Sequence, residues 1–175
     1  MKGLIIYSSK TGNTKHMAEV ICQEISNTSD VDLVDIKEYK NMTESHKENY
    51  DFILLGAWID RGTLENKAMK LFKSLENQKI GLFATLGAMP DSEHGRKVIK
   101  NLEELLKDKE SLGQYICPGL VDEKMIEKLK GITGMVVPKH VKEKMIETSI
   151  ASRYATEEEL EEAGKYFKEK IEEFL

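Results

Sequence analysis

A run of seven polar or small residues near the N-terminus carries the side chains best suited to bind an anion. Residues 8–14 read Ser-Ser-Lys-Thr-Gly-Asn-Thr and precede an amphipathic helical pattern. The run offers four hydroxyl groups, one side-chain amide and the backbone N–H groups of a helix N-terminus. Because a helix dipole attracts anions to this end and hydroxyls donate hydrogen bonds, the run suits a phosphate monoester. Ser, Thr and Asn are also ordinary helix caps, so a capped helix with a solvated turn is the alternative.

The spacing within residues 8–14 argues against two other phosphate ligands. The run matches neither GxxxxGK[ST] nor GxGxxG. We therefore do not expect a nucleoside triphosphate or a dinucleotide here.

A second loop, residues 56–63, follows an apolar run and contains Trp58, the only tryptophan of the chain. A tryptophan on a partly polar loop beside a phosphate site suits stacking on a planar ring. The alternative is a tryptophan that caps the hydrophobic core beneath the loop. A third loop, residues 85–92, holds small residues that let a ligand approach the backbone closely.

The elements around these loops predict an α/β fold. Continuous apolar runs at 3–7, 52–57 and 80–85 indicate buried strands, 31–36 alternates as a more exposed strand does, and 115–117 ends a fifth strand. Helical stripes separate them, at Ala18, Ile21, Cys22 and Ile25, at Ala68, Leu71, Phe72 and Leu75, and at Val98, Leu102, Leu105 and Leu106. This alternation predicts a doubly wound parallel sheet, in which ligands bind beyond the carboxyl ends of the strands.

The C-terminal third predicts three more helices. Residues 122–130 and 139–150 have helical patterns, with a loop at 131–138 between them. Thr156 and Glu159 form a capping-box pattern at the start of the last helix. Its apolar face comprises Leu160, Ala163, Phe167, Ile171 and Phe174. Residues 40–49 are polar and are predicted to form a loop with at most one helical turn.

Length and composition narrow the class of protein. A chain of 175 residues predicts one domain, and a net charge of −5 disfavours nucleic-acid binding. The longest apolar run is too short to cross a membrane, and the N-terminus turns polar too soon for a signal peptide. Cys22 and Cys117 form no CxxC pair, and the four histidines show no metal-binding spacing. We expect a cytoplasmic protein without a metal site.

Residues 4–14 resemble the flavodoxin signature, a strand followed by [ST]-x-T-G-x-T. The resemblance covers roughly residues 1–118 and the final helix, and 56–62 and 85–94 are similar to a subgroup of short bacterial flavodoxin-family proteins. It implies a single flavodoxin-like domain over 1–175, with a doubly wound five-stranded parallel sheet of order 2-1-3-4-5 and helices on both faces. Residues 121–155 are longer and more helical than a short-chain flavodoxin requires.

The resemblance also implies non-covalently bound FMN. The phosphate-binding positions correspond to the side chains of Ser9, Thr11, Asn13 and Thr14 and to the backbone N–H groups of Lys10 and Gly12. Trp58 would flank the isoalloxazine ring. The backbone of Ile59, Asp60, Arg61 and Gly62 would meet flavin N5, and that of Thr85, Leu86, Gly87 and Ala88 the pyrimidine edge.

Two departures from the flavodoxin pattern concern the flavin ring. Flavodoxins usually place a tyrosine from the third loop on the outer flavin face, whereas no aromatic residue occurs between Thr85 and Arg96 here. One ring face is therefore expected to be open. Flavodoxins usually surround the flavin with acidic residues, whereas Arg61 stands in the second loop here. Its charge would favour a reduced, anionic flavin if it lies near flavin N1 or O2.

Three functions are compatible with these residues. The first is an electron carrier that exchanges electrons with a partner protein, either a reductase or a ferredoxin-type donor or acceptor. The second is an FMN-dependent NAD(P)H or quinone oxidoreductase that acts directly on a small substrate at the open flavin face. The third is a non-redox accessory or binding module that keeps the fold. The phosphate-binding run argues against the third.

Overall fold

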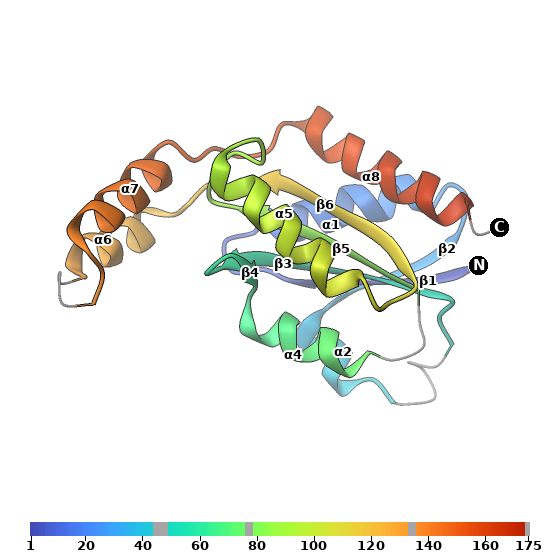
Figure 1. Ribbon diagram of the computed structural model, residues 1–175. Helices are drawn as coiled ribbons and strands as arrows, with labels where there is room; N and C mark the ends of the chain where they lie inside the picture. The colour runs from blue at the N-terminus through green and yellow to red at the C-terminus, as the bar shows by residue number, and fades with distance from the viewer. Residues whose placement is uncertain (44–48, 76–78, 133–135, 174–175) are drawn as a thin grey trace.

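The computed structural model describes residues 1–43, 49–75, 79–132 and 136–173. Its centre is a parallel sheet of order β2-β1-β3-β5-β6 (Figure 1). The parallel strands are β1 (Lys2–Ser8), β2 (Asp30–Asp35), β3 (Phe52–Asp60), β5 (Lys79–Leu86) and β6 (Ser111–Pro118). With the five strands numbered along the chain, this order is 2-1-3-4-5, so the predicted topology is confirmed.

A short strand, β4 (Thr63–Leu64), pairs antiparallel with the end of β3 and makes the sheet six-stranded. The prediction of five strands missed it, because two residues carry no periodic pattern. The connecting residues Arg61 and Gly62 both have positive φ, 51° and 85°. A tight hairpin with this twist requires positive φ at both central residues, which explains the glycine.

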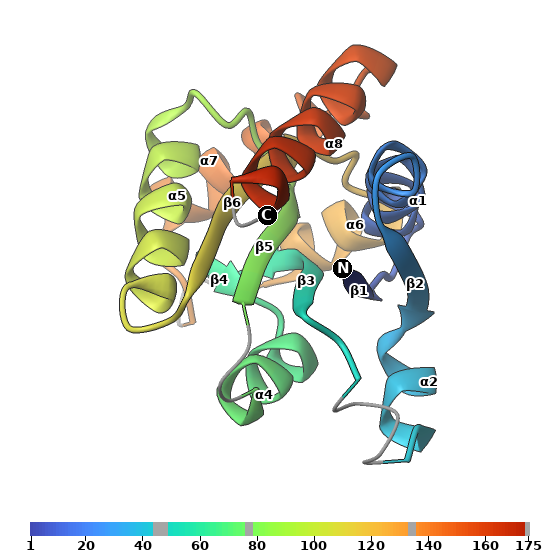
Figure 2. The same cartoon turned by 90° about the vertical axis from the view of Figure 1, so that its right-hand side faces the viewer.

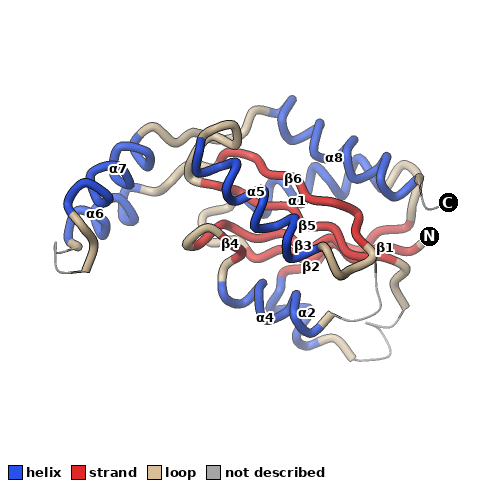
Figure 3. The backbone as a smooth tube through the Cα atoms, viewed as in Figure 1, coloured by secondary structure: helices blue, strands red, loops and turns tan. Residues whose placement is uncertain are grey.

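Helices cover both faces of the sheet (Figures 2 and 3). One face packs against α1 (Asn13–Ile25) and α8 (Glu157–Glu172). The other packs against α2 (Ile36–Asn41), α4 (Asn66–Ser74) and α5 (Glu93–Leu106). Successive side chains of a strand point to opposite faces of the sheet. Leu4 and Ile6 therefore pack on the face covered by α2, α4 and α5, and Ile5 packs on the face covered by α1 and α8.

The strand predicted over 31–36 ends one residue early, because Ile36 begins α2. Asp35 and Glu38 form a capping box at this point. The capping box explains the difference, since the alternating pattern of residues 31–36 fits a strand through Ile36 equally well. The loop predicted over 40–49 overlaps the last two residues of α2, and its residues 44–48 lie outside the described structure.

Two helices, α6 (Glu123–Gly131) and α7 (Lys139–Ile150), form an arm that projects beyond the carboxyl edge of the sheet (Figure 1). Neither helix contributes a buried residue, and Val141, Met145 and Ile150 of α7 are exposed. Both helices begin and end within one residue of their predicted bounds. The predicted 131–138 loop includes 133–135, which the structure does not describe.

The capping box of α8 is present as predicted, with the Thr156 side chain accepting from the Glu159 N–H and the Glu159 carboxylate accepting from the Thr156 N–H. Four of the five predicted apolar residues of α8 are buried, and Phe174 lies outside the described residues. Of the helices described, none combines the length and apolar character needed to span a bilayer.

Candidate functional site

The three predicted loops meet at the carboxyl edge of the sheet. In the strand register Ser8 lies beside Ala57, and Trp58 lies beside Thr85. The loops after β1, β3 and β5 are therefore neighbours in space although they are far apart in sequence. We call them the first loop (8–14), the second loop (56–63) and the third loop (85–92).

The N-terminus of α1 is open to an anion. Gly12, the N-cap residue, has a φ of 96°, no side chain hydrogen-bonds to this end of the helix as a cap, and the first turn contains no acidic residue. By contrast, α2, α4, α5, α6 and α8 each have a side-chain cap, whereas α7, which follows Pro138, has none. The free N–H groups and the helix dipole favour phosphate binding over the capped-helix interpretation.

Side chains of the first loop bond to one another and to the segment after β6. Ser9 Oγ accepts a hydrogen bond from the Gly12 N–H at 3.2 Å. The Asn13 amide donates to Thr11 Oγ1 at 3.1 Å and to the Leu120 carbonyl at 3.0 Å. The predicted phosphate ligands therefore lie together around the N-terminus of α1, and their binding roles stay predictions.

A buried hydroxyl pair joins the first loop to the third. Thr14 Oγ1 and Thr85 Oγ1 are 2.8 Å apart, and both residues are buried. Each hydroxyl carries one hydrogen, and their mutual bond uses only one of the two. The second hydrogen is therefore left for another acceptor, and Thr85 lines the cleft described below. A phosphate oxygen is a suitable acceptor for it.

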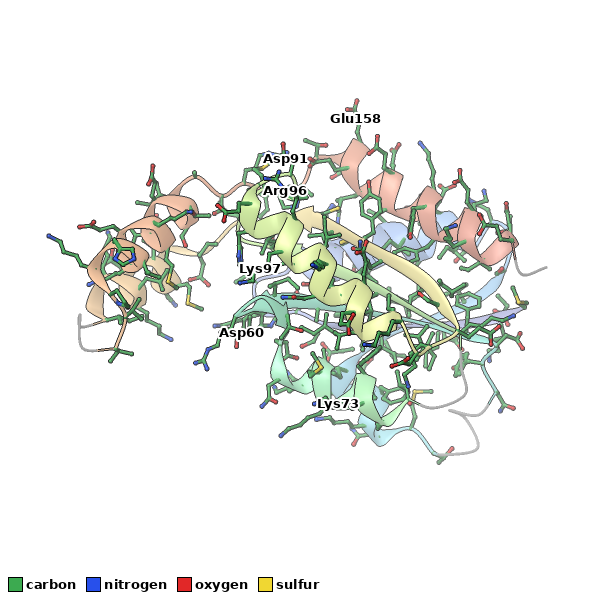
Figure 4. All side chains as sticks on the ribbon, viewed as in Figure 1. Asp60, Lys73, Asp91, Arg96, Lys97 and Glu158 are labelled. Atoms are coloured by element: carbon green, nitrogen blue, oxygen red, sulfur yellow. The ribbon has the colours of Figure 1, made fainter. Side chains whose placement is uncertain are left out.

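Trp58 is half-buried in the second loop and does not belong to either core cluster of the described residues. The Lys10 ammonium lies 5.5 Å from the centroid of its ring. This position favours the stacking hypothesis over that of a core-capping tryptophan. Asp60 and Arg61 are exposed at the tip of the loop, where Figure 4 labels Asp60.

The backbone of the second loop is anchored from both sides. Ile59 packs against the core beneath α4 and α5, and the Asn101 amide of α5 donates to the Gly62 carbonyl at 2.8 Å. These contacts hold the segment that is predicted to meet flavin N5.

The third loop presents mainly backbone. Leu86 and Ala88 are buried, so their side chains belong to the core. A Cβ atom on Gly87 would lie 2.5 Å from Val121 Cγ2, so a larger residue here would have to displace the Val121 side chain. The Gly119 N–H donates to the Leu86 carbonyl at 2.8 Å. The segment that leads to the arm therefore packs directly on this loop.

A cleft of about 440 Å³ adjoins the first loop. It is lined by the predicted residues Thr11, Gly12, Asn13 and Thr85 and also by His16, Pro118, Tyr154, Ala155, Glu157 and Leu160. Sequence reasoning assigned none of the latter six to the site. The signal that could have found several of them is topological: Pro118 ends β6, and Tyr154 to Glu157 lead into α8 at the same edge.

An ion pair fixes the chain where it enters α8. The Arg153 guanidinium donates to both carboxylate oxygens of Glu159, at 2.8 and 2.7 Å. This pairing lowers the pKa of Glu159 to about 2.

The thiol of Cys117 lies near this ion pair. Burial raises the pKa of the Cys117 thiol to about 12, and its Sγ lies 3.6 Å from the Glu159 carbonyl oxygen. Cys117 is thus a buried, protonated thiol. Glu158, in the first turn of α8, points into solvent (Figure 4).

Comparison with known proteins identifies the class. A family model described as a flavodoxin domain matches residues 4–168. This chain therefore belongs to the flavodoxin domain family, and membership implies FMN as the bound cofactor. The uncapped N-terminus of α1, with its hydroxyl and amide donors, fits the phosphate of that cofactor.

The similar sequences include two proteins called flavodoxin-like domain-containing protein BilS. The one from Clostridioides difficile (strain CD3) is 32% identical over 170 residues, which cover 96% of this chain and 95% of the relative. The one from Clostridium symbiosum (strain WAL-14163) is 27% identical over 146 residues, 75% of each chain. The subgroup resemblance seen in residues 56–62 and 85–94 is thereby confirmed.

Solved flavodoxin structures share the fold. Oxidised flavodoxin 1 from Bacillus cereus superposes with a TM-score of 0.59 at 19% identity and 98% coverage of both chains. A flavodoxin from the domain Archaea gives 0.58 at 14% identity, over 99% of this chain and 98% of the other.

The double substitution Thr11→Ala with Asn13→Ala is expected to weaken FMN binding by a few kcal/mol, since a hydrogen bond to a charged group contributes about 1.5–3 kcal/mol. Flavin fluorescence titration measures the change. The control is Asn27→Ala with Thr28→Ala, which alters the same residue types just beyond the other end of α1. Equal FMN affinity in the two double variants would show that the first loop does not bind the phosphate.

Glu159→Gln is expected to lower the free energy of unfolding at neutral pH. Arg153 depresses the folded-state pKa of Glu159 to about 2, against 4.5 for an ordinary glutamate. The stabilisation is therefore fully present above about pH 4.5 and is lost as the pH falls toward about 2. Urea unfolding at several pH values should show the two proteins converging in stability through this window. A difference that stays constant down to about pH 3 would contradict the assignment.

Proposed function

We propose that this protein is an electron carrier that binds FMN non-covalently at the three loops and exchanges electrons with a partner protein. Bound FMN supplies the one- and two-electron redox chemistry, while the chain binds and orients it. The observation that carries the proposal is the uncapped N-terminus of α1, set among donor side chains in a member of the flavodoxin domain family. The partner that we propose is a reductase or a ferredoxin-type protein.

The surroundings of the three loops support a carrier. Lys10, Asp60 and Arg61 are exposed at this edge, so a docking protein can reach the second loop. Two of the groups suited to general acid–base work are poorly placed: Cys117 is buried and protonated, and His94 is exposed on the first turn of α5. Cys22 and Cys117 are both free, which supports the proposed cytoplasmic location.

The cleft beside the first loop favours one alternative. Its volume of about 440 Å³ and its lining by His16, Tyr154 and Glu157 would allow a small substrate to bind. The second candidate is therefore an FMN-dependent NAD(P)H or quinone oxidoreductase that acts without a partner protein.

Anaerobic mixing distinguishes the two functions. FMN-loaded protein is mixed with excess NADH or NADPH, and the visible flavin absorbance is followed. A carrier is expected to keep its oxidised spectrum until a ferredoxin–NADP⁺ reductase is added with NADPH and then to bleach. Rapid bleaching by the nicotinamide alone would favour the oxidoreductase, and no bleaching in the presence of the reductase would also count against the carrier.

A further inference from the structure

The buried serine, threonine and carboxylate side chains of the described residues all lie at one place. They are Ser8, Thr14, Glu65 and Thr85. They form two hydrogen-bonded pairs, Ser8 with Glu65 and Thr14 with Thr85, at the carboxyl edge of the sheet. Burying polar groups is unfavourable unless they are hydrogen-bonded. We therefore expect the two pairs beneath the candidate site to have a role in that site.

Glu65 is the buried ionisable member of this group. Its Oε1 accepts from Ser8 Oγ at 2.7 Å and from the Ala68 N–H at 3.1 Å, and its Oε2 accepts from the Lys67 N–H at 2.8 Å. No cationic side chain of the described residues forms an ion pair with it. Its charge is therefore stabilised by the N-terminus of α4 and by the Ser8 hydroxyl.

The backbone of Glu65 is tied to the second loop. Its N–H donates to the Trp58 carbonyl at 3.1 Å, next to the short β3–β4 ladder. Glu65 thus contacts both Ser8, which ends β1 and begins the first loop, and Trp58 of the second loop.

Helix capping alone does not explain a glutamate at position 65. The other capped helices begin with shorter side chains, namely Asp35, Ser92, Asp122 and Thr156. Short side chains are the preferred N-caps, because their oxygen reaches the first N–H groups directly. The additional methylene of Glu65 lets a capping carboxylate also reach Ser8 across 57 residues of sequence.

We propose that Glu65 is a positioning residue for FMN binding, which acts through its hydrogen bond to Ser8 to hold the first and second loops in the geometry that FMN requires. This inference rests on the proposed FMN site. The Thr14–Thr85 pair ties the other end of the first loop to the third. The first loop is therefore fixed at both ends by buried bonds.

Two variants of Glu65 separate capping from positioning. Glu65→Asp keeps the charge and supplies a preferred N-cap, but its side chain is too short to reach Ser8. Glu65→Gln keeps the reach to Ser8 but is a poorer cap, because one amide end cannot accept from an N–H. FMN affinity is measured by flavin fluorescence titration, and apoprotein stability by urea unfolding.

If Glu65 positions the loops, Glu65→Asp weakens FMN binding about tenfold, as expected for a lost bond to a charged group. Glu65→Gln then binds FMN more tightly than Glu65→Asp does, although it is the less stable protein. Ser8→Ala reproduces the loss seen in Glu65→Asp, and combining the two gives no further loss, because both remove the same bond.

The proposal is overturned if Glu65→Asp binds FMN more tightly than Glu65→Gln does. If Glu65→Asp and Ser8→Ala bind FMN as wild type does, Glu65 is only a helix cap. If the wild-type protein itself binds no FMN, the proposed cofactor site fails instead, so the two failures are distinguishable.

Discussion

The structure depends on the order in which the parallel strands lie side by side. Because β1 lies between β2 and β3, and β3 between β1 and β5, the carboxyl ends of β1, β3 and β5 share one edge. Loops after these strands must then be neighbours. These loops contain the hydroxyls of residues 8–14, the tryptophan and the uncapped N-terminus of α1. Two buried hydrogen-bonded pairs, Ser8–Glu65 and Thr14–Thr85, hold the loops against one another.

The rest of the domain supplies a rigid apolar support. Residues such as Phe83 and Phe167, which pack edge to face with ring centroids 6.4 Å apart, fix α8 on the sheet. Among the residues described, the buried serine, threonine and carboxylate side chains lie at the edge where a ligand is expected. The arm of α6 and α7 differs, since it contributes no buried residue. Its base nevertheless contacts the site, through Val121 at Gly87 and through Leu120 at Asn13.

The sequence predicted the fold well, because apolar runs of strand length and helical stripes are local patterns. The same patterns predicted which loops lie at the carboxyl edge of the sheet, and residues 8–14 contain the family signature. Three features could not be predicted. The β4 hairpin is too short to show a period. Glu65 reads as an ordinary polar residue before a helix, and its partner Ser8 lies 57 positions away. The Thr14–Thr85 bond spans 71 positions, and a single sequence does not show such pairings.

Binding of FMN at the three loops is best tested by titrating the protein with FMN while tryptophan fluorescence and flavin fluorescence are followed together. Trp58 is the only tryptophan, so its emission reports on the second loop alone. If FMN binds at the three loops, it quenches Trp58, and both signals reach their end point at one equivalent of FMN. FMN binding that leaves Trp58 emission unchanged would place the cofactor elsewhere, and an absence of binding would contradict the site itself.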